Sequence, residues 1–325
     1  MIAAAQQSSR TDTAPGMCSV VIPAHNAAPF IADAIESVRR QTRAAWELVV
    51  VDDASTDETA ATVRALEEPR LTLLAQERNR GVSAARNRGL AAASGEYVLF
   101  LDADDWLMPD ALERLIGALA AHPEAAAAYG EAVCADASGR AYGTGQRPLF
   151  HRRPSGEVAE ALLAHNFVVT PGVLCARTAA VRAAGGFDES VRVAEDWVLW
   201  CALARRGPFH YVPPPPVLTY RHSGQSVTQT TGFDIAETLA CIEAAFAHPE
   251  VRAMPARRLR ACRRKREAGA HAFVATQHVR ARNFDSARKH LTACLRLHPV
   301  RPRAWILLCL CLARWLPAPA ARRLK

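Results

Sequence analysis

Short apolar runs alternate with amphipathic segments between residues 18 and 102. The runs of strand length, rich in Val, Ile and Leu, lie at residues 18–23, 46–52, 70–76 and 96–102. The segments with helical periodicity between them lie at about 29–41, 57–67 and 82–93. Near-continuous apolar strands joined by helices are typical of a parallel sheet covered on both faces. The pattern therefore predicts an α/β fold with a doubly wound, mainly parallel sheet flanked by helices.

The remainder of the chain is less regular. Residues 138–156, rich in Gly, Pro and Arg, indicate a loop or lid. Short strands at 172–177 and 217–221 enclose a helix at about 195–206, and helical patterning dominates from about Gly232 onward. The expected parts are a flexible leader, an α/β domain and a helical basic C-terminal region, at residues 1–16, 17–230 and 231–325.

Charge is divided unevenly between these parts. The formal net charge of the whole chain is +8. Residues 251–325 hold 19 Lys and Arg but 2 Asp and Glu, a net of +17, which leaves the other 250 residues at −9. The chain is thus an acidic body followed by a basic tail, and the partners of each have to be considered separately.

Three interpretations of the basic tail remain open. Its run RRLRACRRKRE at 257–267 can neutralise nucleic-acid phosphates, but the tail lacks interleaved aromatic residues for base stacking. Residues 301–325 place an apolar stretch with Trp305 and Trp315 between arginines, which is typical of a segment lying in a membrane interface. A helix packed on the body with a solvated charged face is the third interpretation. We expect an anionic membrane surface as partner and not nucleic acid.

The cysteines and the apolar segments bear on the compartment. Nine cysteines are scattered without a C-x-x-C pair, and most lie in apolar stretches, as Cys18, Cys175, Cys201 and Cys241 do. Free thiols that pack as small hydrophobes are typical of a protein in a reducing compartment. This pattern disfavours disulfides and a zinc site. No apolar run reaches the roughly 20 residues of a membrane-spanning helix. We therefore expect a cytoplasmic protein, or one held peripherally on the inner face of the cell membrane.

Polar residues follow three of the predicted strands where each strand ends. They are His25 and Asn26, Asp52 and Asp53, and Asp102 and Asp104. Ligands of open parallel sheets bind beyond the carboxyl ends of the strands. In an extended segment Asp102 and Asp104 point to the same side, and two carboxylates at one point repel each other unless a cation or proton lies between them. Mg²⁺ or Mn²⁺ bridging to a substrate diphosphate is one interpretation, and a solvated acidic turn with Asp105 or Asp110 capping the next helix is the other.

Two further acidic pairs have a functional and a structural interpretation. Asp52 and Asp53 can accept hydrogen bonds from a base or a ribose, or they can cap the following helix. Glu195 and Asp196 are at the start of a predicted helix beside Trp197. A carboxylate there can act as a general base that takes a proton from a hydroxyl, or it can interact favourably with the helix dipole. The sequence has neither a G-x-G-x-x-G nor a G-x-x-x-x-G-K-[ST] motif, which disfavours a nicotinamide fold or a P-loop.

Six segments occur in order along residues 18–228. They are SVVIPAHNAAPFIADAIESVRRQT, ELVVVDDASTDET, NRGVSAARNRGL, GEYVLFLDADD, AEDWVLW and YRHSGQSVT. Together they closely resemble family 2 glycosyltransferases with the GT-A fold. Each segment is short, but their order and spacing make the resemblance specific. The resemblance implies an inverting enzyme that uses a nucleotide-diphosphate sugar, with UDP as the default nucleotide.

The resemblance also implies roles for individual residues. Its nucleotide-sugar-binding set is Pro23, His25, Asn26, Asp52, Asp53, Arg86, Asn87, Asp102 and Arg221. It places Asp102 near the ribose, Asp104 on the metal and Asp196, beside Glu195, as the catalytic base. Some family members have a metal-ligating histidine two residues after the arginine, where this chain has Ser223. His222 stands one residue earlier, and it completes the implied metal set of Asp102, Asp104 and His222.

The expected function is the transfer of a sugar from a nucleotide-diphosphate sugar to a hydroxyl of a glycan or lipid-linked acceptor, in cell-envelope or polysaccharide synthesis. The expected cofactor is Mn²⁺ or Mg²⁺. One alternative is a catalytically silent glycosyltransferase-like binding or scaffold module, although Asp53, Asp102, Asp104 and Asp196 are all present. The other is a nucleotidyltransferase, which usually carries a Gly-rich loop with Lys or Arg where this chain has PAHNAAP.

Overall fold

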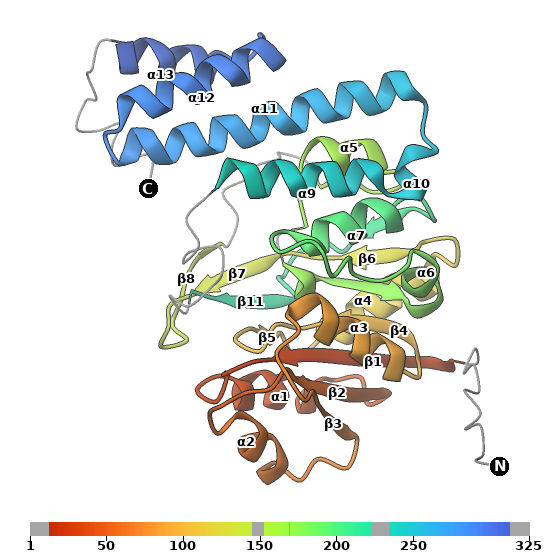
Figure 1. The fold of residues 1–325 in the computed structure, drawn as a ribbon. Helices are drawn as coiled ribbons and strands as arrows, with labels where there is room; N and C mark the ends of the chain where they lie inside the picture. Colours follow the sequence, from red (N-terminus) through yellow and green to blue (C-terminus); the bar gives the residue numbers. More distant parts are fainter. Residues whose placement is uncertain (1–12, 145–152, 169, 223–233, 313–325) are drawn as a thin grey trace, which may run out of the picture.

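A seven-stranded sheet forms the centre of the α/β part (Figure 1). The computed structural model of the chain describes residues 13–144, 153–168, 170–222 and 234–312. The order of the strands is β10 (Phe209–Tyr211), β6 (Ala127–Tyr129), β9 (Leu174–Arg177), β4 (Gly95–Phe100), β1 (Ala14–Ala24), β2 (Trp46–Asp52) and β3 (Leu71–Ala75). Strands β1 to β4 pair in parallel, and β9 runs antiparallel to β4 and β6. The predicted α/β fold with a mainly parallel sheet is confirmed.

Helices flank this sheet and follow its strands in the chain (Figure 1). Those of the α/β part are α1 (Ile31–Arg39), α2 (Thr59–Ala65), α3 (Val82–Ala92), α4 (Ala111–Ala121), α5 (Ala159–Ala164), α6 (Thr178–Ala183) and α7 (Glu195–Leu203). A 3-10 turn at Pro171–Val173 precedes β9, so the strand predicted at 172–177 begins two residues later than expected. Strand β1 begins at Ala14, within the stretch predicted as leader, whose residues 1–12 lie outside the described residues.

Strand β1 is an interior strand of the sheet, between β4 and β2, and its apolar run is buried on both faces. Val20, Val21 and Ile22 are fully buried between β2 and β4. Helix α3 packs directly on β1 at Gly89, where a Cβ atom would lie 2.2 Å from Cγ1 of Val21. Only glycine permits this approach. It fixes the first turns of α3, including Arg86, near the carboxyl ends of the parallel strands.

A second sheet of four short strands accompanies the first. Its order is β5 (Trp106–Leu107), β11 (Leu218–Arg221), β7 (Ala132–Ala135) and β8 (Ala141–Thr144). The strand predicted at 217–221 therefore belongs to a separate sheet, which the sequence pattern does not reveal because these strands are two to four residues long. Strand β8 lies within the stretch predicted as a loop or lid, and residues 145–152 of that stretch lie outside the described residues.

The C-terminal helices stack on one side of the α/β part (Figure 1). They are α9 (Ile235–Ala247), α10 (Pro249–Arg252), α11 (Ala256–Arg280), α12 (Phe284–Leu297) and α13 (Pro302–Leu312). The first three contribute Ile242, Val251 and Cys262, respectively, to the hydrophobic core of the α/β part. Helices α11, α12 and α13 enclose a second apolar cluster that includes Leu291 and Leu307. Within the described residues, none of the helices has both the length and the apolar character that crossing a bilayer requires.

The cysteines pack as the sequence predicts. Cys18, Cys175, Cys201 and Cys241 are at most 4% exposed, and all nine thiols of the chain are free. Cys309 on α13 is the exposed one. The thiols thus fill the core as small apolar side chains, and one of them offers a reactive handle on the outer helices.

Candidate active site

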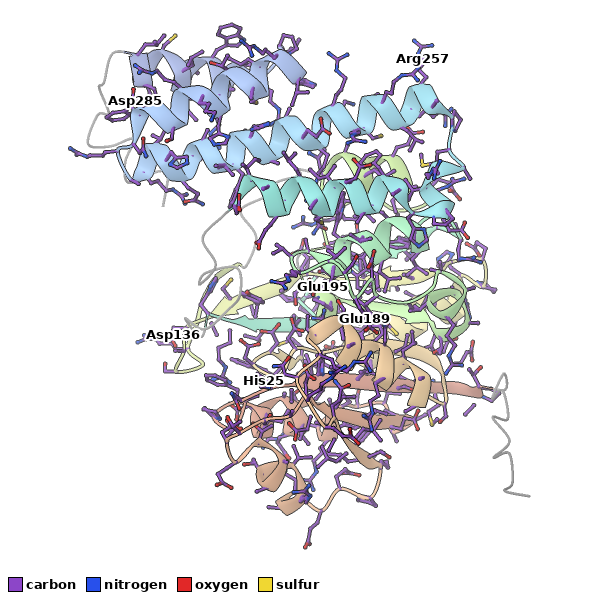
Figure 2. All side chains as sticks on the ribbon, in the orientation of Figure 1. His25, Asp136, Glu189, Glu195, Arg257 and Asp285 are labelled. Atoms are coloured by element: carbon purple, nitrogen blue, oxygen red, sulfur yellow. The ribbon has the colours of Figure 1, made fainter. Side chains whose placement is uncertain are left out.

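A cavity of about 500 Å³ opens beyond the carboxyl ends of β1 and β4. Eight residues of the predicted site line it: Pro23, His25, Asn26, Arg86, Asp102, Asp104, Glu195 and Asp196. They come from segments far apart in the sequence, and Figure 2 shows where His25 and Glu195 lie on the fold. The structure therefore brings most of the predicted nucleotide-sugar, metal and catalytic residues to one place.

Arg86 of α3 joins the two acidic motifs of this cavity. Its Nη1 donates to Oε1 of Glu195 at 2.5 Å and its Nη2 donates to Oδ1 of Asp102 at 2.7 Å. Burial alone would lower the pKa of the Arg86 guanidinium, but Asp102 and Glu195 outweigh it and raise that pKa. Arg86 is thus a permanent cation that fixes the segment containing Asp102 and Asp104 against the first turn of α7.

Asp196 lies in the first turn of α7 with its carboxyl group almost fully buried. The backbone N–H of Trp197 donates to its Oδ1 at 2.6 Å. Burial and the neighbouring Glu195 raise the pKa of Asp196 to about 7, although Arg86 and the Trp197 N–H oppose this shift. A carboxylate with a pKa near neutrality is well suited to take a proton from a hydroxyl, because its protonation state and its basicity are both favourable there.

The acidic cluster after β4 has a different geometry from the one expected. Strand β4 ends at Phe100, and the backbone turns so that the N–H of Asp105 donates to the carbonyl of Asp102 at 3.1 Å. The extended-strand argument for Asp102 and Asp104 is therefore wrong, although both line the cavity. Asp105 does not cap α4, because its carboxylate accepts from the backbone N–H of Arg221 at 3.0 Å. Burial, with Asp102 and Asp104 nearby, raises the pKa of Asp105 well above its ordinary value.

The residues that can hold a divalent metal are Asp102 and Asp104. The Asp102 side chain stays 28% exposed although Arg86 binds one of its oxygens. His222 does not line the cavity, and its Nε2 lies 3.3 Å from Sγ of Cys134. Among the described residues, no three His, Cys, Asp or Glu side chains are close enough to hold a metal by themselves. Mg²⁺ and Mn²⁺ fit this donor set, because such ions are often held by one or two carboxylates together with substrate phosphates.

Asp52 and Asp53 do not line the cavity. Asp53 accepts from Nε2 of Gln76 at 2.7 Å and from the backbone N–H groups of Arg80 and Gly81, each at 2.8 Å. Asp52 accepts from the backbone N–H of Ser55 at 3.1 Å. Neither caps α2, whose N-cap residue is Glu58. Their carboxylates thus hold the loops after β2 and before α3.

Asn87 and Arg221 do not line this cavity either. Asn87 makes two hydrogen bonds of 2.8 Å with the backbone N–H and carbonyl of Phe187. Arg221 donates to Oδ2 of Asp33 at 2.6 Å and lines a second cavity, of about 470 Å³. Both side chains stabilise the walls around the site. Ser223 lies outside the described residues.

Several cavity residues escape sequence reasoning. Asn166 and Thr170 come from the irregular segment between α5 and β9, where no motif or periodicity marks them. Arg192 is an exposed cation three residues before Glu195, and its proximity to that pair is the one available signal. Phe30 precedes α1 and adds an aromatic ring to the wall.

The basic tail reaches the back of this site. The guanidinium carbon of Arg266 on α11 lies 4.3 Å from the ring centroid of Trp197. Burial lowers the pKa of Arg266, while Cys241, Cys201 and Asp196 act against that shift. Helix α9 contributes as well, because Sγ of Cys241 contacts the carbonyl of Ala194 at 3.6 Å. The first turn of α7 is therefore contacted by both α9 and α11.

Comparisons with known proteins bear on the family and the fold of the chain. Residues 19–178 match the model of glycosyl transferase family 2. The succinoglycan biosynthesis protein ExoO of Rhizobium meliloti is 30% identical over 239 residues, 70% of this chain and 66% of ExoO. The UDP-Glc:alpha-D-GlcNAc-diphosphoundecaprenol beta-1,3-glucosyltransferase WfgD of Escherichia coli is 40% identical over 100 residues, 31% of this chain and 40% of WfgD. The chain thus spans less than two thirds of the length of these curated relatives.

Solved structures share the fold. TarS 1–349 of S. aureus in complex with UDP-GlcNAc has a TM-score of 0.65 at 18% identity, covering 92% of this chain and 88% of TarS. The mannosyltransferase PcManGT of Pyrobaculum calidifontis, in complex with GDP-Man and Mn²⁺, has a TM-score of 0.56 at 24% identity, covering 96% of this chain and 86% of PcManGT. Residues 19–178 therefore belong to glycosyl transferase family 2, and the chain has the GT-A fold of these transferases.

Proposed function

We propose that this glycosyltransferase moves a sugar from a UDP-sugar to a hydroxyl of a glycan or lipid-linked acceptor, with inversion, in polysaccharide or cell-envelope synthesis. The observation that carries the proposal is the Arg86 bridge, which holds the Asp102 segment and Glu195 next to each other in the lining of one cavity. A donor diphosphate and an acceptor hydroxyl have to meet in such a place. The names of TarS with UDP-GlcNAc and of WfgD with UDP-Glc support a UDP-sugar donor.

Asp196 acts as the general base in this proposal. Its carboxylate takes the proton of the acceptor hydroxyl, whose oxygen forms a bond to the anomeric carbon of the donor sugar. The bond between that carbon and the diphosphate oxygen breaks, and the nucleoside diphosphate leaves with the electron pair. A single displacement inverts the anomeric carbon, so no sugar becomes attached to the enzyme. Glu195, bound to Arg86, keeps the first turn of α7 in place.

The donor side of the cavity is formed by Asp102, Asp104 and Arg192. Asp104 and Asp102 would hold the Mn²⁺ or Mg²⁺ ion, and the exposed Arg192 guanidinium would contact the diphosphate. A bound divalent ion supplies positive charge that stabilises the leaving diphosphate. His25 is exposed at the mouth of the cavity, with Nδ1 2.8 Å from the carbonyl of Asp53, which orients its ring for stacking on the base.

The acceptor class connects this site to a membrane. The name of WfgD specifies a diphosphoundecaprenol-linked acceptor, and an acceptor of that kind is anchored in a membrane. We therefore include in the proposal that the enzyme works peripherally at a membrane face, with its basic C-terminal region toward the lipid.

The substitution Asp196→Asn tests this function. We expect kcat to fall by about 10²-fold or more while UDP still binds, because the amide cannot take the proton. UDP release gives kcat and calorimetric titration gives UDP affinity, with Asp188→Asn, an exposed carboxylate outside the cavity, as the matched control. In the wild-type enzyme, kcat/KM should decrease below about pH 7 as Asp196 becomes protonated. Full activity of Asp196→Asn would refute the assignment, and wild-type binding of UDP-sugars without any turnover would favour the silent module.

A further inference from the structure

Helix α13 exposes an apolar stripe on its outer side. Trp305, Ile306 and Leu312 are 50%, 60% and 62% exposed, and Cys309 is exposed between them. Positions 305, 309 and 312 fall on one face of a helix, with 306 at its margin. The opposite face, with Leu307 and Cys311, is buried in the apolar cluster shared with α12. The side chains of the stripe therefore take no part in the apolar cluster that holds α11, α12 and α13 together.

The helices that form this stack carry an excess of exposed positive charge. Exposed Arg and Lys side chains occur along α11, α12 and α13, for example Arg264, Lys289 and Arg303. Asp285 is the one exposed acid within the described residues 256–312. Helices α12 and α13 form the layer farthest from the main sheet, and Arg257 points outward at the other end of α11 (Figures 1 and 2). Large apolar side chains and cations thus share the outer surface of the stack.

We propose that the outer face of α13, with the cations of α11 and α12 around it, docks on an anionic lipid surface. Trp305, Ile306 and Leu312 enter the boundary between headgroups and acyl chains, and Arg303 and its neighbours contact lipid phosphates. This inference deepens the proposed function, since it names the surface that holds the enzyme beside a lipid-linked acceptor. Binding to vesicles is measured without any sugar substrate, so it succeeds or fails independently of the catalytic assignments.

Charge complementarity selects lipid over the other occupants of such a face. A second copy of the chain would bring the same positive helices together, which like charges oppose. Nucleic acid would match the cations but would leave Ile306 and Leu312 in water or against phosphates. An anionic membrane satisfies both features at once, because it offers negative headgroups above an apolar layer.

Vesicle co-sedimentation of the full chain tests the face. We expect binding to phosphatidylcholine vesicles that contain about a third phosphatidylglycerol, and weak binding to phosphatidylcholine alone. The double variant Trp305→Ser, Leu312→Ser should bind about tenfold more weakly, whereas Trp305→Phe should bind nearly as wild type. Arg303→Gln should lose up to about fivefold, and Arg64→Gln, an exposed arginine on α2, should lose nothing. Circular dichroism on each variant checks that the helices remain folded.

Cys309 provides a direct readout of the geometry, because it is the exposed thiol of the chain. An environment-sensitive fluorophore attached there should shift its emission to shorter wavelength when anionic vesicles are added. The control carries the fluorophore at Ala61 on α2, in the double variant Cys309→Ser, Ala61→Cys, and should not respond. Equal binding of both vesicle types, an unchanged Cys309 signal, or binding of duplex DNA or self-association in place of vesicle binding would each overturn the proposal.

Discussion

The α/β part and the C-terminal helices carry charge in opposite ways. The α/β part buries its important cations against carboxylates: Arg86 is held by Asp102 and Glu195, and Arg221 by Asp33. The helices display most of their cations to solvent and place Arg266 against the ring of Trp197. Buried pairs fix geometry, whereas exposed cations attract a partner. Net charge alone, a modest +8, conceals both roles.

The largest effect that separates the two regions should come from removing divalent metal. Chelation by EDTA should abolish turnover, because the carboxylates of Asp102 and Asp104 would then face the diphosphate without a neutralising ion. Vesicle binding should be unchanged, since the cations of the helices need no metal. Raised salt should weaken vesicle binding before it affects turnover in solution. Turnover in EDTA at the same rate as without EDTA would show that Asp102 and Asp104 do not act through a metal.

Replacing Arg86 should have the next largest effect. Arg86→Met leaves Asp102 and Glu195 without their shared cation, so we expect the free energy of unfolding to fall by about 3–5 kcal/mol and kcat by about 10²-fold or more. Arg86→Lys should recover part of both, because lysine cannot hold two carboxylates with one planar fork. Chemical denaturation and UDP release measure the two quantities. The control is Arg88→Met, an exposed arginine on the same helix, and a similar loss in that variant would contradict the bridge.

A smaller effect is expected from Arg266, where the tail touches the body. Arg266→Met should lower kcat by about tenfold with KM for the donor unchanged, since Trp197 loses the guanidinium that holds it beside Asp196. Arg266→Lys should restore part of kcat. The matched control is Arg260→Met, which lies on the exposed side of the same helix. Equal kcat values for Arg266→Met and Arg260→Met would mean that the tail does not influence catalysis.

The sequence predicts the strands of the core better than it predicts the contacts within the site. The parallel core was predictable because β1, β2 and β4 are continuous apolar runs of the kind that a sheet covered on both faces buries. The Arg86 bridge was not, because Glu195 lies 109 positions away and only the tertiary fold makes them neighbours. For the same reason Asp53 looked like a ligand-facing carboxylate, although it binds backbone N–H groups of its own chain. The roles of single site residues remain predictions, while the fold and the family are established.

Three residues close together on helix α3 each make a contact that fixes the rotation of the helix. Arg86 has to face Glu195, Asn87 has to face the backbone of Phe187, and Gly89 has to touch Val21. Inserting or deleting one residue before Arg86 would rotate every later side chain by about 100° around the helix axis. No single replacement could then restore all three contacts. During evolution, many positions of this helix can therefore accept substitutions, but the helix cannot gain or lose a residue before Arg86. Surface loops of the same protein can accept both kinds of change.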